Sequence, residues 1–263
     1  MKMGVSDMST DELGFHNPPL EKQNNCDKHG DFVDFCYMRK TWQGCQICRQ
    51  IKKDEADESE RQYQIQVANI HLRRRISDSG IPDRFLNRTL DNYLVSDGNL
   101  KQDKILKYCI DYAKNFSDRK KTGLSFLMLG LPGTGKTHLS IGIAFEVMKN
   151  GHSSVFTTAS RMLRAIKDTY HKGSEFSEKQ VLATYETCDL LIIDEIGVQT
   201  GSDYEKNIIF DVINSRYENV RPTIILSNLS IDECKLYLGE RVFDRMREGG
   251  GKAFLLDWPS FRK

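Results

Sequence analysis

The strongest chemical signal in the chain is residues 130–137, which fit the pattern G-x-x-x-x-G-K-[ST]. An apolar run, residues 124–129, precedes this loop, and a helical pattern, residues 138–149, follows it. Glycines there let backbone N–H groups point at phosphate oxygens, and the helix dipole favours anions. We expect Lys136 to reach the β- and γ-phosphates of ATP and the Thr137 hydroxyl to ligate Mg²⁺. The expected nucleotide contacts are Gly130, Pro132, Gly133, Thr134, Gly135, Lys136, Thr137 and His138.

A second signal is the pair Asp194-Glu195, directly after four apolar residues, 190–193. Such a run is typical of a buried parallel strand, which would place Asp194 at the carboxyl end of a sheet. Asp194 would hold Mg²⁺ through water, and Glu195 would polarise the attacking water as a general base. A capping pair after a core strand is the structural alternative. Combined with the phosphate loop, the pair predicts ATP binding and hydrolysis.

Asn228 follows another apolar run, residues 223–226. In sheets of this kind that strand neighbours the Asp194 strand. The amide would then lie between Glu195 and the γ-phosphate and orient the water. A strand-end turn is the alternative, because asparagine favours turns.

Three arginines, Arg241, Arg245 and Arg247, lie within seven positions. Arginine stabilises charge on a transferring phosphoryl group, often from a neighbouring subunit. A solvated helix face explains the same spacing, so the pattern alone leaves both interpretations open.

Two chelating pairs lie near the N-terminus, Cys26-x-x-His29 and Cys45-x-x-Cys48, separated by 15 residues. Each pair suits one tetrahedral ion, so the spacing predicts a zinc ribbon with a hairpin between the pairs. Without a metal this short polar segment would not fold. Cys36 could replace His29 as a ligand, and incidental cysteines in an unstructured leader are the alternative.

Alternating strands and helices are predicted to position these groups. This is the α/β pattern of an open parallel sheet with helices on both faces. The predicted strands are residues 124–129, 154–158, 190–193, 223–226 and 254–258. The predicted helices are residues 138–149, 160–170 (with Ser160 as N-cap) and 204–217.

Apolar residues at helical spacing predict one amphipathic helix over residues 49–79, ending before Pro82. Its apolar stripe is Ile65, Ala68, Leu72 and Ile76. The predicted organisation is a disordered leader (1–25), a zinc module (26–48), a linker helix (49–80) and an ATPase domain (81–263).

Composition excludes several classes of protein. The net charge of +1 means that any nucleic-acid contact depends on local basic patches. No apolar run approaches the roughly 20 residues of a membrane span, and the N-terminus lacks a secretion signal, which indicates a cytoplasmic protein. Seven cysteines, an odd number, argue against a disulfide framework.

From about Arg73 onward the sequence resembles the DnaC-type helicase loaders and the related IstB transposition helpers. The stretches that carry the resemblance are residues 79–85 (SGIPDRF), 130–139 (GLPGTGKTHL), 194–199 (DEIGVQ) and 238–246 (LGERVFDRM). The family implies an AAA+ ATPase with a reduced helical lid. It also implies partners: a replicative helicase hexamer, single-stranded DNA, and other copies of the chain across the ATP sites.

The resemblance also implies roles for three residues. Arg245 would be the arginine finger acting on a neighbour's ATP, Arg262 a sensor in its own chain, and Asn228 the first sensor. Helicase loaders carry an N-terminal partner-binding region, so the zinc module resembles a docking device.

Two rival functions stay open from the sequence. One is an IstB-like transposition regulator that wraps duplex DNA, with the zinc module binding DNA. The other is a nucleotide-gated adaptor with negligible turnover.

Overall fold

The computed structural model describes residues 19–37, 41–171, 173–197 and 203–261. Contacts divide the chain into two compact units, Met1–Ala68 and Asn69–Lys263. The division falls inside helix α1, Gln46–Asp78, rather than at the predicted boundary between residues 80 and 81. The reason is that Leu72 and Ile76, near the end of α1, pack against the core of the second unit.

The first unit contains a three-stranded antiparallel sheet in the order β1-β2-β3. Its strands are β1 (Leu20–Cys26), β2 (Gly30–Tyr37) and β3 (Thr41–Trp42). The predicted hairpin between the chelating pairs is the β2–β3 pair. Predicting disorder for residues 20–25 was wrong, because β1 pairs with β2 along its whole length. Residues 1–18 lie outside the described part of the chain.

Helix α1 begins three residues earlier than predicted and ends one residue earlier. None of its 33 residues is buried. Only part of its predicted apolar stripe contacts the hydrophobic core. Leu72 and Ile76 pack against that core, whereas Ile65 is 47% exposed.

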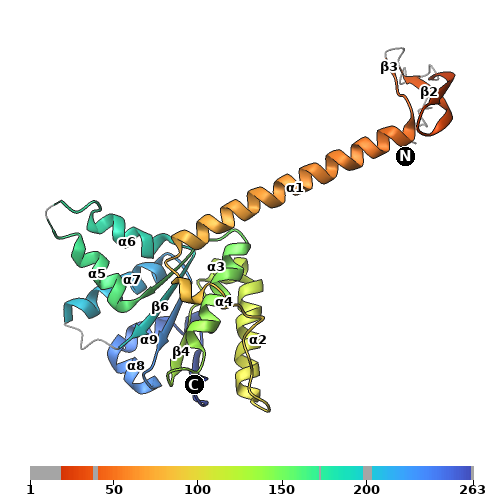
Figure 1. Ribbon diagram of the computed structural model, residues 1–263. Helices are drawn as coiled ribbons and strands as arrows, with labels where there is room; N and C mark the ends of the chain where they lie inside the picture. Colours follow the sequence, from red (N-terminus) through yellow and green to blue (C-terminus); the bar gives the residue numbers. More distant parts are fainter. Residues whose placement is uncertain (1–18, 38–40, 172, 198–202, 262–263) are drawn as a thin grey trace, which may run out of the picture. The chain divides into compact units, whose positions relative to one another are not determined.

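The second unit is built on a five-stranded sheet in the order β5-β6-β7-β4-β8, with every neighbouring pair parallel (Figure 1). All five predicted strands are present, which confirms the α/β class. They are β4 (Phe126–Gly130), β5 (Ser154–Thr158), β6 (Leu190–Ile196), β7 (Thr223–Ser227) and β8 (Ala253–Leu256). Strand β8 ends two residues before the predicted Trp258.

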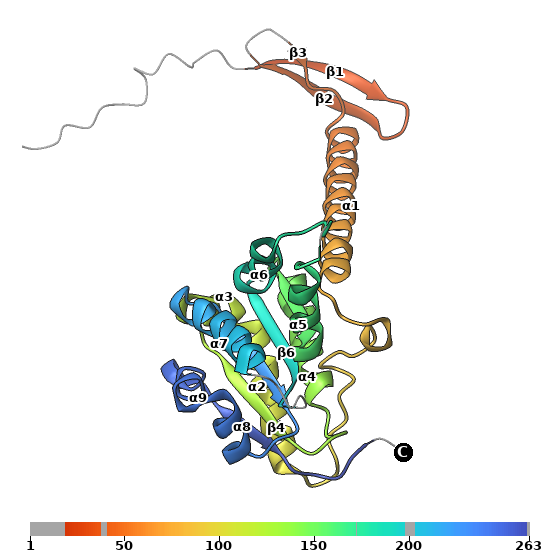
Figure 2. The same ribbon diagram turned by 90° about the vertical axis from the view of Figure 1, so that its left-hand side faces the viewer.

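Helices cover both faces of this sheet (Figure 1, Figure 2). The structure contains the three predicted helices, but Thr158 rather than Ser160 caps α5, by accepting a hydrogen bond from the Arg161 N–H. These helices are α4 (Lys136–Lys149), α5 (Ala159–Asp168) and α7 (Asp203–Glu218). Further helices not predicted are α2 (Leu100–Lys114), α3 (Phe116–Thr122), α6 (Glu178–Thr187), α8 (Ile231–Leu238) and α9 (Glu240–Arg245).

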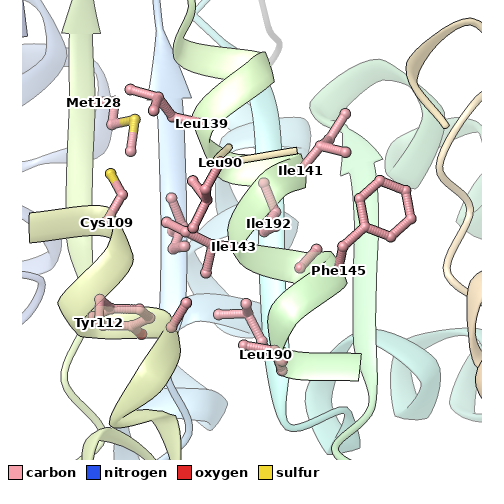
Figure 3. Close-up of a cluster of buried hydrophobic side chains, with 14 of the residues drawn as sticks. Leu90, Cys109, Tyr112, Met128, Leu139, Ile141, Ile143, Phe145, Leu190 and Ile192 are labelled. Carbon is pink, nitrogen blue, oxygen red and sulfur yellow. The ribbon is translucent and has the colours of Figure 1, made fainter. Parts of the chain in front are cut away.

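The hydrophobic core forms one cluster on each face of the sheet. Successive residues of β4 alternate between them: Phe126 and Met128 join the α2–α4 side, and Leu127 and Leu129 join the α5–α7 side. Figure 3 shows part of the first cluster, including Cys109, Tyr112, Met128, Leu139, Ile143 and Ile192. Burial on both faces explains why the inner strands β4, β6 and β7 are largely apolar, whereas the edge strand β5 (SVFTT) has three polar residues.

Candidate nucleotide site and metal centre

The phosphate loop joins the end of β4 to the first residue of α4, Lys136. Gly133 and Gly135 have φ values of 79° and 96°, which residues with a side chain rarely adopt. No side chain caps the first turn of α4. Its backbone N–H groups are therefore left for an anion, as a phosphate site requires.

The Lys136 side chain is buried beneath this loop, with 6% of the residue exposed. Its ammonium donates to the carbonyl oxygens of Gly130 (2.7 Å) and Leu131 (2.8 Å) and to Oδ1 of Asn228 (2.9 Å). Asn228 directly follows β7, which neighbours β6 as predicted. The structure thus brings the predicted lysine and asparagine into direct contact.

Thr137 and Asp194 also meet. The Thr137 hydroxyl donates to Oδ2 of Asp194 at 2.8 Å, and the N–H of Glu195 donates to Oδ1 at 2.7 Å. A hydroxyl and a carboxylate at this spacing supply the hard oxygen ligands that Mg²⁺ prefers. These residues fit a magnesium ion bound together with nucleotide phosphates.

Glu195 occupies a β-bulge between Ile193 and Ile196. Its φ of 59° lies in the left-handed region, which is uncommon for a residue with a side chain and costs on the order of 1 kcal/mol or more. The bulge leaves Glu195 exposed at the sheet end. A carboxylate there suits the predicted general base.

Lys136, Thr137, Asp194, Glu195 and Asn228 line one cavity of about 360 Å³. Four residues that were not predicted from the sequence also line it: Arg84, Phe85, Arg88 and Phe261. Arg84 and Phe85 belong to a stretch that carried the family resemblance, but no spacing rule connects them to the phosphate loop. The full lining is Arg84, Phe85, Arg88, Pro132, Gly133, Gly135, Lys136, Thr137, His138, Asp194, Glu195, Asn228 and Phe261.

His138 has a structural role in addition to lining this cavity. Its Nε2 lies 2.8 Å from both the Thr89 carbonyl oxygen and Oδ1 of Asn92. Burial lowers the pKa of His138. A carbonyl oxygen only accepts, so Nε2 carries a proton and donates it to the Thr89 oxygen. The ring therefore ties the loop before α2 to the first turn of α4.

One predicted arginine of the described chain lies outside this cluster. Arg245 ends α9 and does not line the cavity; its guanidinium carbon lies 4.7 Å from the centre of the Tyr217 ring. Its role as an arginine finger stays a prediction. Arg262 lies outside the described residues.

The two chelating pairs converge in the first unit. Ligand atoms of Cys26, His29, Cys45 and Cys48 lie within 4.8 Å of one another. The Cys26 and Cys48 sulfurs are 3.5 Å apart, and Nδ1 of His29 is 3.3 Å from the Cys48 sulfur. Two thiolates bound to one tetrahedral zinc lie about 3.8 Å apart, so this geometry fits zinc. Cys36 lies in β2 and is not among the four.

Electrostatics at the four ligands also suits a cation. A hydrogen bond from the Lys28 N–H lowers the pKa of the Cys26 thiol to about 6. The neighbouring Cys26 in turn raises the pKa of Cys48 to about 11. Two neighbouring thiolates repel each other, and a divalent ion would offset that repulsion by stabilising both of them.

The phosphate loop, the Asp194-Glu195 strand end and the adjacent Asn228 define an ATPase of the P-loop AAA+ class. The model of the family described as IstB-like ATP binding protein matches residues 110–246. The chain therefore belongs to the DnaC- and IstB-like family of AAA+ ATPases.

Among similar proteins are the replicative helicase loaders DnaC of Buchnera aphidicola subsp. Baizongia pistaciae (strain Bp) and of Escherichia coli (strain K12). They are 37% identical over 192 residues and 38% identical over 193, and each match covers 73% of this chain and 76% of the relative. A crystal structure of the DnaC helicase loader matches with a TM-score of 0.58 at 25% identity, covering 66% of this chain and 99% of that one.

Within the described part of the chain, no helix is both long enough and apolar enough to span a bilayer.

Proposed function

We propose that this protein binds a replicative DNA helicase and loads it onto single-stranded DNA in an ATP-dependent step. The observation that carries the proposal is the similarity to replicative helicase loaders over 73% of the chain. Most of the predicted nucleotide-site residues line one cavity, which supports it; Gly130 and Thr134 are not among the lining residues. A loader of this kind acts in the cytoplasm.

In this proposal the nucleotide site performs ATP hydrolysis with Mg²⁺. The phosphate loop and Lys136 hold the phosphates, and Thr137 and Asp194 hold the metal. Glu195 accepts the proton of the attacking water, and Asn228 orients that water. The ion would neutralise charge on the phosphates. Arg245 from a neighbouring copy would stabilise the transferring phosphoryl group, so the active form is a homo-oligomer.

The zinc module is proposed to dock the helicase. Its metal would hold the turns that carry Cys26 and Cys45 and so present the β1–β2–β3 sheet as a rigid surface. An exposed tryptophan and tyrosine at the ends of this sheet, Trp42 (37%) and Tyr37 (55%), suit a protein partner.

Single-stranded DNA is proposed as the second partner. Helix α5 exposes Arg161, Arg164 and Lys167 along one short segment. A local basic row of this kind supplies phosphate contacts although the net charge of the chain is only +1.

The test is retention of the purified full chain by an immobilised replicative helicase hexamer, with and without ATP. We expect retention of the unmodified chain and its loss in Cys45→Ser/Cys48→Ser, which removes two zinc ligands. Cys36→Ala is the matched control, because it alters a cysteine of the same sheet outside the ligand set. Retention of the ligand-free variant would contradict docking by the zinc module.

A second function has one specific observation in its favour, the match to the IstB-like family model. If the unmodified chain is not retained in any nucleotide state, the loader proposal fails. Binding to duplex DNA that requires ATP would then support the transposition regulator.

A further inference from the structure

One carbonyl of the phosphate loop accepts hydrogen bonds from two side chains distant in sequence. The Tyr93 hydroxyl donates to the Thr134 oxygen at 3.1 Å, and Nε1 of Trp258 donates to the same oxygen at 3.0 Å. Both donors are buried, with 7% and 5% of their surface exposed. Neither is among the residues that line the nucleotide cavity.

The Thr134 carbonyl and the Gly135 N–H belong to one planar peptide. The described chain has no cis peptide bonds, so this C=O and this N–H point in opposite directions. Tyr93 and Trp258 hold the carbonyl toward the protein interior. The Gly135 N–H is consequently directed to the opposite side, where Gly135 lines the cavity.

The same loop is packed between two segments. A Cβ added to Gly135 would lie 2.5 Å from Cε2 of Tyr93, and one added to Gly133 would lie 1.9 Å from Oγ of Ser260. The Phe261 N–H donates to the Gly133 oxygen at 3.0 Å. Residues 258–261, after the last strand, thus contact two successive carbonyls of the loop.

Tyr93 is itself held in place by Gln102 of α2, which is fully buried. Nε2 of Gln102 donates to the Tyr93 hydroxyl at 3.1 Å and to the Leu94 oxygen at 3.0 Å. Burial raises the pKa of Tyr93, which keeps the hydroxyl protonated. Because the Tyr93 oxygen accepts a hydrogen bond from Gln102, its own proton is directed to the Thr134 oxygen.

We propose that Tyr93 and Trp258 are positioning residues that hold the phosphate loop in its phosphate-binding conformation before the nucleotide arrives. The loop then loses little conformational entropy on binding, which strengthens affinity for the phosphates. The inference rests on the proposed nucleotide site and is independent of helicase loading.

The test compares Tyr93→Phe with Tyr112→Phe. Tyr112 is a matched control, because its fully buried hydroxyl also donates to a backbone carbonyl, that of Leu124 at 2.8 Å, away from the loop. We expect Tyr93→Phe to weaken ADP binding about 3- to 10-fold, the effect of one lost hydrogen bond. Adenosine, which lacks phosphates, should bind unchanged.

Titration calorimetry with ADP and with adenosine gives these affinities, and thermal unfolding gives the stability of each variant. Tyr112→Phe should lower the thermal midpoint but leave ADP affinity unchanged. Trp258→Phe, which removes the second donor, should weaken ADP binding as Tyr93→Phe does. Unchanged ADP affinity in Tyr93→Phe, an equal loss in Tyr112→Phe, or equal losses for ADP and adenosine would each overturn the proposal.

Lys136→Ala in the same titration separates this proposal from the site assignment. It should abolish ADP binding. If Lys136→Ala binds ADP normally, the nucleotide site itself is misassigned. If Lys136→Ala loses ADP binding but Tyr93→Phe binds ADP with unchanged affinity, only the positioning role is refuted.

Discussion

Arg245 illustrates how a single side chain can be placed outside the site that it is proposed to serve. Its Nη1 is buried without a hydrogen-bond partner among the described residues, while the guanidinium stacks on Tyr217. A buried cationic donor without a partner is costly, and such groups occur at functional positions. The contact with the Tyr217 ring orders the side chain, and the unpaired Nη1 is consistent with a functional position.

Arg245→Ala should leave ATP affinity unchanged and lower stimulated hydrolysis about 10³-fold, because an arginine finger acts on the transition state in another subunit. Steady-state phosphate release in the presence of helicase and single-stranded DNA measures this. Arg241→Ala is the control, since Arg241 is exposed on the same short helix.

Mixing two inactive variants tests action in trans. Glu195→Gln lacks the proposed base but keeps Arg245, and Arg245→Ala has the reverse defect. An equal mixture should recover part of the activity at mixed interfaces. If Arg245→Ala alone hydrolyses ATP at the normal rate, the finger lies elsewhere.

Helix α4 shows how the loop before α2 restrains the element that follows the phosphate loop. The loop crosses α4 at Gly142, where an added Cβ would lie 2.8 Å from the backbone nitrogen of Leu90. His138, one turn earlier, bonds to the carbonyl of Thr89 in the same loop. Glycine inside a helix is unfavourable by itself, so close backbone approach accounts for its presence here.

Gly142→Ala should therefore destabilise the second unit, although alanine raises helix propensity by about 1 kcal/mol. Overpacking against backbone costs about 1–3 kcal/mol, which outweighs that gain. The midpoint of thermal unfolding should fall by a few degrees. Thr184→Ala, at an exposed position of α6, is the control and should not lower the midpoint. A higher midpoint in Gly142→Ala would show that the loop shifts to accommodate the added Cβ without loss of stability.

The two units depend on different sources of stability. The second unit has a hydrophobic cluster on each face of its sheet. In the described part of the first unit, the buried side chains are only Asp34, Cys36 and Cys45. So small a core does not offset the conformational entropy of folding, and structural zinc contributes about 10 kcal/mol in comparable modules.

Removal of metal should therefore unfold the first unit and spare the second. We expect about one zinc per chain by metal analysis. After chelation, residues 20–45 should become sensitive to limited proteolysis, while ATP affinity stays unchanged. Protection of that segment in metal-free protein would contradict the zinc assignment.

Contiguous motifs were predictable from the sequence because their chemistry is local. A phosphate loop needs consecutive backbone N–H groups, so residues 130–137 identify it without knowledge of the fold. Apolar runs predicted the inner strands β4, β6 and β7, since strands buried on both faces admit few polar residues. The two chelating pairs were also recognisable from their spacing, because the two residues of each pair lie three positions apart.

Other features depended on tertiary contacts. Helices α2 and α6 were not predicted, because much of their surface is polar and the side chains that bury them contact distant parts of the chain. Tyr93 and Trp258 bond to the phosphate loop from segments far from it in sequence, and Arg84 lines the same cavity as the loop. No spacing rule describes such approaches. The grouping of His29 rather than Cys36 with the other three ligand candidates likewise appears only in the folded chain. The sequence by itself determined which residues are proposed to hold ATP, whereas only the folded chain decided which side chains contact those residues, because that selection depends on three-dimensional packing.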